Sequence, residues 1–270
     1  MNTRETALPA ELLEVAQKAF QRHIALRGIA IPFPAIELAP EFDEGEYALA
    51  DQQILVGSKN AVMTALGEFL RSAGTKRGKF KPAKGFRCVY LALHFFNTYQ
   101  KAPLKFVFEY IEDLALWGFN VIQTGVAPTI RYLSGPDPET PDMVRANRIL
   151  DHAYNLGFKF YGGGMANGGF IDTPLEFRAA DSGRGRDGRE ICPNIPGGFD
   201  LIMRIHRANA AARKYLDYLN IWPYDEGGCG CEKCRPWGSN GMLMCGREMA
   251  KIYKEKFPDL KVVYTTWCFN

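Results

Sequence analysis

Cysteines suited to binding a metal ion gather late in the sequence. Cys229, Cys231 and Cys234 form a C-x-C-x-x-C run. Three thiolates at this spacing can converge on one tetrahedral ion, and zinc is the ion that we expect. A fourth thiolate can come from Cys192, in the long segment before the run, or from Cys245 after it. We take Cys192 as the expected fourth ligand.

Other interpretations of the same cysteines stay open. Reduced or disulfide-paired thiols could instead stiffen this loop, although seven cysteines, four of them within seventeen residues, do not resemble a secreted disulfide framework. A site closed by four thiolates holds a loop in place, whereas catalysis needs an open position on the metal. We therefore expect structural zinc and no organic cofactor. A metalloenzyme that uses the cysteine cluster is an alternative.

Two adjacent carboxylates, Asp225 and Glu226, come directly before the cysteine run and after a strand-like segment. Carboxylates held close together repel, so the pKa of one rises and that group can act as a general acid while the other stays ionised. Neighbouring side chains of a strand point to opposite faces, so both can serve one substrate only where the strand ends or bulges. Gly227 and Gly228 allow this. Helix-capping or solvated acids are the alternative.

Further side chains suited to sugar binding lie near the ends of predicted strands. The candidates for hydrogen bonds are His94, Asn97 and Gln123, and those for aromatic stacking are Trp222, Tyr224, Trp237 and Trp267. A flat aromatic ring can cover the C–H face of a pyranose, and core packing is the alternative for each ring. The glycines at 162–164 lack the Gly-Lys-Ser/Thr of a phosphate-binding loop, so we expect them to leave backbone room near a ligand.

An alternation of strands and helices from residue 85 onward must position these groups. Periodicity predicts strands at 86–93, 119–123, 158–161, 218–222 and 261–267, and helices at 103–116, 141–154, 199–216 and 242–257. Repeated strand-helix-strand units imply parallel strands with right-handed crossovers, hence a doubly wound sheet or a barrel. Long segments after the strands and tight turns after the helices favour the barrel, with its site at the carboxyl ends of the strands.

The chain before this alternation predicts a separate small α+β domain, residues 1–84. Its elements are a helix at 8–26, strands at 47–50 and 53–57, and a helix at 60–72 that Ser58 caps and Gly74 ends. Residues 85–270 then form the barrel domain. Because eight strands need roughly a hundred more residues, we expect an α/β fold of the TIM-type (β/α) barrel kind, truncated after strand five, in a chain that is a fragment. An open sheet is the alternative.

The segment 224–228, Tyr-Asp-Glu-Gly-Gly, resembles the Asp-Glu pair that ends the fourth barrel strand of hexosaminidase-type glycoside hydrolases, family twenty, and of related α-glucuronidase-like barrels. Segments 87–94 and 117–122 are similar to the beginning of those barrels, and the small α+β domain resembles the one that precedes them. The resemblance implies hydrolysis of terminal N-acetylhexosaminide-like sugars. It implies Glu226 as general acid and Asp225 as the group that orients a substrate acetamido group for attack on its own anomeric carbon. A carbohydrate-binding barrel without catalysis is the alternative.

Charge and hydropathy limit the classes of partner. A net charge of +3, from 33 basic and 30 acidic residues, is too small to indicate nucleic acid, and the basic segment 76–84 is interpreted as a solvated linker. The polar N-terminus carries no signal-peptide pattern, and no apolar run is long enough to span a membrane. We therefore expect a cytoplasmic protein with a carbohydrate substrate and no membrane partner. The sequence leaves a homo-oligomer open.

Overall fold

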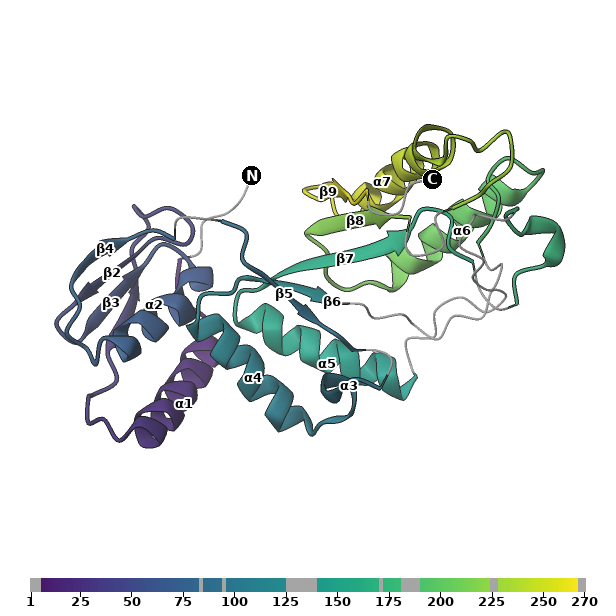
Figure 1. Ribbon diagram of the computed structural model, residues 1–270. Coiled ribbons are helices and arrows are strands. Elements are labelled where there is room, and N and C mark those ends of the chain that lie inside the picture. The colour runs from purple at the N-terminus through teal and green to yellow at the C-terminus, as the bar shows by residue number, and fades with distance from the viewer. Residues whose placement is uncertain are drawn as a thin grey trace. The chain divides into compact units, whose positions relative to one another are not determined.

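The computed structural model describes most of the chain (Figure 1). The described residues are 6–82, 85–93, 96–124, 140–169, 172–180, 190–223 and 228–266. The chain divides into two compact units. The first consists of Met1–Leu91, Phe95–Gln123 and Asn147–Lys159, and the second of Ala92–His94, Thr124–Ala146 and Phe160–Asn270.

Helices and short strands alternate along the chain. The helices are α1 (Ala10–Arg27), α2 (Lys59–Arg71), α3 (Thr98–Lys101), α4 (Leu104–Leu116), α5 (Pro141–Asn155), α6 (Gly198–Ala212) and α7 (Met244–Lys256), with a 3-10 turn η1 (Leu175–Phe177) and a π-helical segment η2 (Gly238–Leu243). The strands are β1 (Ala35–Leu38), β2 (Tyr47–Ala50), β3 (Gln53–Val56), β4 (Gly78–Phe80), β5 (Cys88–Leu91), β6 (Val121–Thr124), β7 (Lys159–Met165), β8 (Tyr218–Trp222) and β9 (Lys261–Tyr264).

The first unit contains a small mixed sheet with the strand order β1-β3-β2-β4. β1 runs parallel to β3, whereas β2 runs antiparallel to both β3 and β4. Buried and half-buried residues alternate along β2 and β3, so one face of the sheet forms core, and α2 lies against it. The Ser58 side chain accepts a hydrogen bond from the Asn60 backbone N–H at 3.3 Å, which confirms the predicted cap of α2.

Three short elements of this unit were not predicted. β1 and β4 lie at the edges of the small sheet and have no buried residue, and α3 has none either. An edge strand with little burial needs no apolar alternation, so the sequence carries no signal for it. The basic segment at 76–84, interpreted as a linker, accordingly includes β4.

The larger sheet is parallel and has five strands in chain order, β5-β6-β7-β8-β9. Tyr161 to Met165 of β7 pair with Tyr218 to Trp222 of β8, and β8 pairs in turn with β9. α6 connects β7 to β8, and α7 connects β8 to β9, because parallel neighbouring strands need a crossover connection. The predicted α/β alternation is confirmed for all five strands, and β7 extends beyond its predicted end.

Three consecutive glycines, 162–164, lie within β7. A Cβ on Gly163 would lie 2.9 Å from the Asn220 carbonyl oxygen of β8, and one on Gly164 would lie 3.3 Å from the His206 ring of α6. The glycines therefore let the neighbouring strand and helix approach β7 closely. This packing corrects the expectation that they leave room for a ligand.

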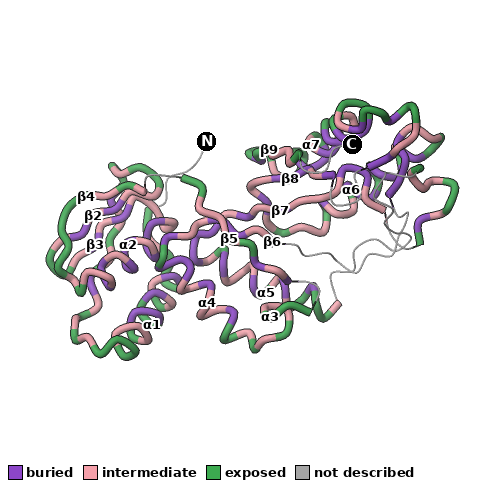
Figure 2. The backbone as a smooth tube through the Cα atoms, in the orientation of Figure 1, coloured by how far each residue is buried: buried purple, intermediate pink, exposed green. Residues whose placement is uncertain are grey.

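The core of the second unit lies between α6, α7 and the strands that they cover. Its buried side chains include Leu201, Ile202 and Ile205 of α6, Leu219 and Ile221 of β8, and Met249, Ile252 and Tyr253 of α7. Figure 2 shows buried positions along these three elements. Within the described part of the chain, no helix combines the length and apolar character needed to cross a membrane.

Candidate metal centre and carboxylate segment

Four cysteine side chains meet in the second unit. The Sγ atoms of Cys192, Cys229, Cys231 and Cys234 all lie within 4.8 Å of one another. Cys192 Sγ lies 3.8 Å from Cys231 Sγ and 3.7 Å from Cys234 Sγ. The four cysteines are free, and these separations far exceed the roughly 2.05 Å of a disulfide bond. Four soft ligands around one point can hold a tetrahedral metal ion.

Backbone hydrogen bonds attach Cys192 to the end of β7. The N–H of Cys192 donates to the Phe177 carbonyl at 2.9 Å, and the N–H of Ile191 donates to the Asn167 carbonyl at 2.9 Å. The buried Asn167 side chain donates back to the Ile191 carbonyl at 3.0 Å. Because Asn167 follows β7 by two residues, the position of Cys192 depends on that strand.

A tight turn presents the last two cysteines of the run. The backbone N–H groups of Cys234 and Arg235 both donate to the Cys231 carbonyl, at 3.0 and 3.1 Å. The Asn194 side-chain amide donates to Cys234 Sγ at 3.1 Å. An N–H donor to sulfur favours the thiolate, which is the form that binds a metal.

Burial raises the pKa of several of these thiols and so favours the neutral thiol over the thiolate. It raises the pKa of Cys229 to about 11 and also raises the pKa of Cys234. At Cys231 burial again raises the pKa, but hydrogen bonds within the cluster, first among them one with Cys234, outweigh it and leave the pKa lowered. A cation among the four sulfurs would supply the charge that stabilises thiolates, so metal binding here would release protons.

A fifth cysteine, Cys245, is fully buried close to the start of α7 and does not belong to the cluster. Burial raises its pKa to about 12, as expected for an inert core thiol. The sequence left Cys192 and Cys245 open as the fourth ligand, and the structure brings Cys192 to the other three.

The predicted catalytic pair falls on residues that the structure does not describe. The sequence-predicted site residues outside the described ranges are Asp225, Glu226, Tyr224, His94 and Trp267. In the sequence, Pro223 follows β8 and the carboxylate segment, residues 224–227, follows Pro223. This segment ends two residues before Cys229. The Trp222 carbonyl, at the end of β8, accepts a hydrogen bond from the Ala166 N–H at 3.2 Å.

Three other predicted sugar contacts are described, each within its own unit. Asn97 is exposed and directly precedes α3, and Gln123 is half-buried on β6, both in the first unit. Trp222 is half-buried as the last residue of β8, in the second unit. Their roles in binding a sugar stay predictions.

Trp237 has a packing role instead of the predicted ligand contact. The residue is 1% exposed, so neither face of its ring is open to a sugar. A Cβ on Gly228 would lie 2.1 Å from the ring, and one on Gly241 only 1.9 Å from it. The two glycines thus let the indole enter the core beside the cysteines, and Trp237 fixes the segment that follows the cysteine run.

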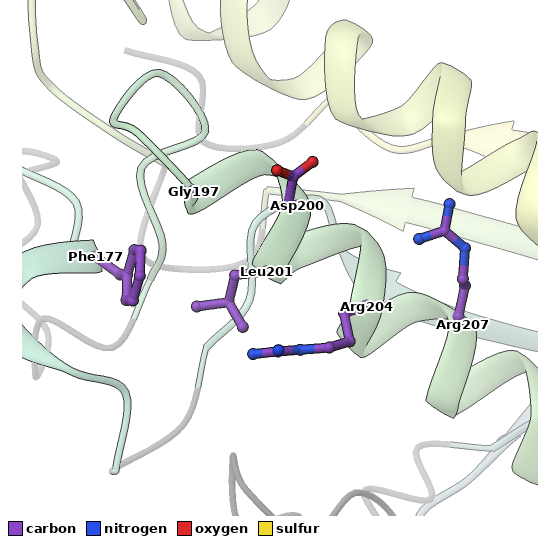
Figure 3. Close-up of a pocket in the computed structure, with 6 residues that line it drawn as sticks. All are labelled: Phe177, Gly197, Asp200, Leu201, Arg204 and Arg207. Carbon is purple, nitrogen blue, oxygen red and sulfur yellow. The ribbon is translucent and has the colours of Figure 1, made fainter.

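A pocket of about 470 Å³ lies beside the first turns of α6. Its lining residues are Phe177, Gly197, Asp200, Leu201, Arg204 and Arg207 (Figure 3). In Figure 3 the Arg204 side chain extends below Leu201. The side chains of Asp200 and Arg207 point upward in this view, away from the Arg204 side chain. This pocket was not predicted, because charged residues at these spacings are ordinary on an exposed helix face.

Solved structures of carbohydrate-active enzymes share this fold. The family-twenty exo-β-N-acetylglucosaminidase of Vibrio harveyi, as an inactive mutant, matches with a TM-score of 0.59 and 14% identity over 96% of this chain and 50% of its own. The same enzyme in complex with N-acetylglucosamine matches with a TM-score of 0.57, again at 14% identity and with the same coverage. A family 138 enzyme that targets pectin rhamnogalacturonan II matches with a TM-score of 0.54 and 10% identity, over 91% of this chain and 32% of its own.

These similarities are similarities of fold. The chain spans about half the length of the Vibrio harveyi structures, and no protein-family model and no curated protein matches its sequence. The structural resemblance to family-twenty β-hexosaminidase catalytic domains, expected from the sequence, is confirmed over most of the chain.

Proposed function

We propose that this chain belongs to a glycoside hydrolase that removes terminal N-acetylhexosaminide-like sugars, with Asp225 and Glu226 as its catalytic pair. One observation carries the proposal. The pair follows β8, the fourth of five parallel strands, after Pro223 and Tyr224, in a fold shared with a family-twenty enzyme. Catalytic groups of such barrels come from the carboxyl ends of the strands.

The proposed chemistry uses the two carboxyl groups differently. Glu226 gives its proton to the glycosidic oxygen as the bond to the anomeric carbon breaks, and the substrate's acetamido oxygen forms the new bond to that carbon. Asp225, ionised, orients the acetamido group and stabilises the positive charge that it acquires. Water then opens the cyclic intermediate while Glu226 takes back a proton. An adjacent carboxylate raises the pKa of a neighbouring acid, which suits Glu226 to this role.

An N-acetylhexosamine is the first choice of substrate. The Vibrio harveyi enzyme with the shared fold has been solved with N-acetylglucosamine bound. Trp222, at the end of β8 and next to the carboxylate segment in sequence, is the described side chain that we assign to sugar stacking.

The proposal includes a zinc ion in a structural role at the four clustered cysteines. Four thiolates fill a tetrahedral coordination sphere and leave no position for water or substrate. The cluster therefore favours carboxylate catalysis over a metalloenzyme that uses this ion.

Hydrolysis of aryl glycosides tests the proposal. The panel contains the β-N-acetylglucosaminide, the β-glucoside and the β-glucuronide, assayed with the wild type, Glu226→Gln and Glu232→Gln. Glu232 is an acid in the same stretch of chain and lies within the cysteine run, so its variant is a control for the loss of one charge. We expect turnover of the N-acetylglucosaminide to fall by about 100-fold or more in Glu226→Gln and to stay unchanged in Glu232→Gln.

Three results would contradict the proposal. Equal turnover by the wild type and Glu226→Gln would remove Glu226 from catalysis. A folded wild type that binds N-acetylglucosamine but hydrolyses none of the glycosides would support a sugar-binding protein instead. A preference for the β-glucoside over the N-acetylglucosaminide would contradict participation of the acetamido group.

A further inference from the structure

We infer that Cys192, Cys229, Cys231 and Cys234 form a closed tetrahedral zinc site that fastens the segment after β7 to the segment after β8. The inference rests on the positions of the four sulfurs and on how the chain holds them. It does not depend on the proposed glycosidase activity.

The sulfur positions fit the dimensions of zinc coordination. With a Zn–S distance of about 2.3 Å and tetrahedral angles, two sulfurs of one site lie about 3.8 Å apart. Cys192 Sγ lies 3.8 Å from Cys231 Sγ and 3.7 Å from Cys234 Sγ, and no pair within the cluster exceeds 4.8 Å. Two disulfides would instead draw the sulfurs together in pairs, to about 2.05 Å.

The chemistry of the ligands indicates the class of metal. Thiolates are soft ligands, which exclude magnesium and calcium, and zinc is the usual ion of a structural site with four cysteines. Three of the four cysteines are buried, so the bound ion would be shielded from water and competing ligands. Since the protein already supplies four ligands, the ion would have the closed coordination of a structural site.

Asn194 forms hydrogen bonds beside the four sulfurs. Its side-chain amide donates to Cys234 Sγ at 3.1 Å and to the Lys233 carbonyl at 3.4 Å. Because Asn194 follows Cys192 by two residues, it joins the same two segments that the ion would join. Hydrogen bonds from such outer residues orient metal ligands and tune their affinity.

The two segments are distant in sequence and each depends on its own strand. Cys192 is 39 residues from Cys231 and 42 from Cys234. The Cys192 segment is hydrogen-bonded to Asn167 at the end of β7, and the other three cysteines follow β8. A metal ion that closes such a long loop reduces the freedom of the unfolded chain, so its binding stabilises the fold.

Metal analysis of the full 270-residue chain tests the site. Zinc content is measured by plasma mass spectrometry after purification without metal-affinity resin, for the wild type, Cys192→Ser and Cys234→Ser. The controls are Cys245→Ser, a buried thiol outside the cluster, and Cys88→Ser, a half-buried thiol of β5. We expect about one zinc ion per chain in the wild type and both controls, and, in competition with a chelator, at least about tenfold weaker zinc affinity in the two ligand variants.

X-ray absorption of the zinc-loaded wild type keeps the test decisive if a ligand variant does not fold. Four sulfur neighbours at about 2.3 Å would support the closed site. A wild type that binds no zinc, or a shell containing oxygen or nitrogen, would overturn it. Wild-type zinc affinity in Cys192→Ser would overturn the link between the two segments. Hydrolase activity is measured in none of these experiments, so the proposed function can fail independently.

Discussion

The imidazole of His206 is a buried group whose ionisation links folding stability to pH. His206 is 3% exposed on α6, and burial lowers its pKa to about 4. In an unfolded chain the pKa of histidine is about 6.5. Between these two values the unfolded chain binds a proton that the folded protein does not, so stability falls as the pH is lowered from about 6.5 to 4. The gap corresponds to roughly 3 kcal/mol of unfolding free energy.

Urea unfolding at several pH values between 4 and 7 measures this contribution. His206→Met removes the titrating group at similar volume, so we expect a flatter dependence of unfolding free energy on pH in this range. Tyr253→Phe is the matched control, because its ring lies 6.2 Å from the imidazole and the histidine is retained. The same pH dependence in His206→Met and the wild type would show that other groups cause the acid sensitivity.

Among the elements, η2 has a tight packing constraint at Gly241. A Cβ on Gly241 would lie 1.9 Å from the buried Trp237 ring, so Gly241→Ala must displace the indole or the helix backbone. We expect a loss of about 1 to 3 kcal/mol of unfolding free energy, measured by urea unfolding. Ser239→Ala, a change at an exposed residue of the same element, should cost far less unfolding free energy.

A double variant identifies the cause of that loss. Trp237→Leu alone destabilises by leaving a cavity, and the same cavity makes room for the methyl group that Gly241→Ala adds. The variant that carries both Trp237→Leu and Gly241→Ala should therefore lose less unfolding free energy than the sum of the losses in the two single variants. Additive costs would instead mean that Gly241 is needed for its backbone and not for the space beside the indole.

The sequence predicted elements well where burial and chain termination act locally. Helices such as α2 carry an apolar face and a capping residue, and the glycines predicted to end α4 and α5, Gly118 and Gly157, both have the left-handed backbone that favours glycine, with φ of 90° and 86°. β1 and β4 bury too little surface to produce a pattern. The glycines of β7 were wrongly predicted to leave room for a ligand, because their role depends on Asn220 of β8 and His206 of α6, which are distant from them in the sequence.

At the scale of the whole molecule, tertiary contacts determine which distant residues come together, a question that the spacing of residues in the sequence left open. The C-x-C-x-x-C run indicated a metal ligand set, but the choice between Cys192 and Cys245 depends on how β7 and β8 bring distant segments together. Trp237 illustrates the reverse case. Its place near the end of a predicted strand suggested stacking on a sugar, and the packing of Gly228 and Gly241 against the ring shows that Trp237 belongs to the core.

Zinc removal connects the metal centre with the proposed activity. The carboxylate segment 224–227 starts after β8, which is paired to β7, and ends two residues before Cys229, a proposed zinc ligand. Since the ion would hold one end of this segment, chelation should lower the melting temperature and also lower kcat for the aryl N-acetylglucosaminide, with a smaller change in KM. Both should recover when zinc is added back. Glu226→Gln, without activity to lose, should show the same shift in melting temperature. A lower melting temperature with unchanged kcat, assayed where the chelated protein stays folded, would mean that the ion stabilises the fold without positioning the carboxylates.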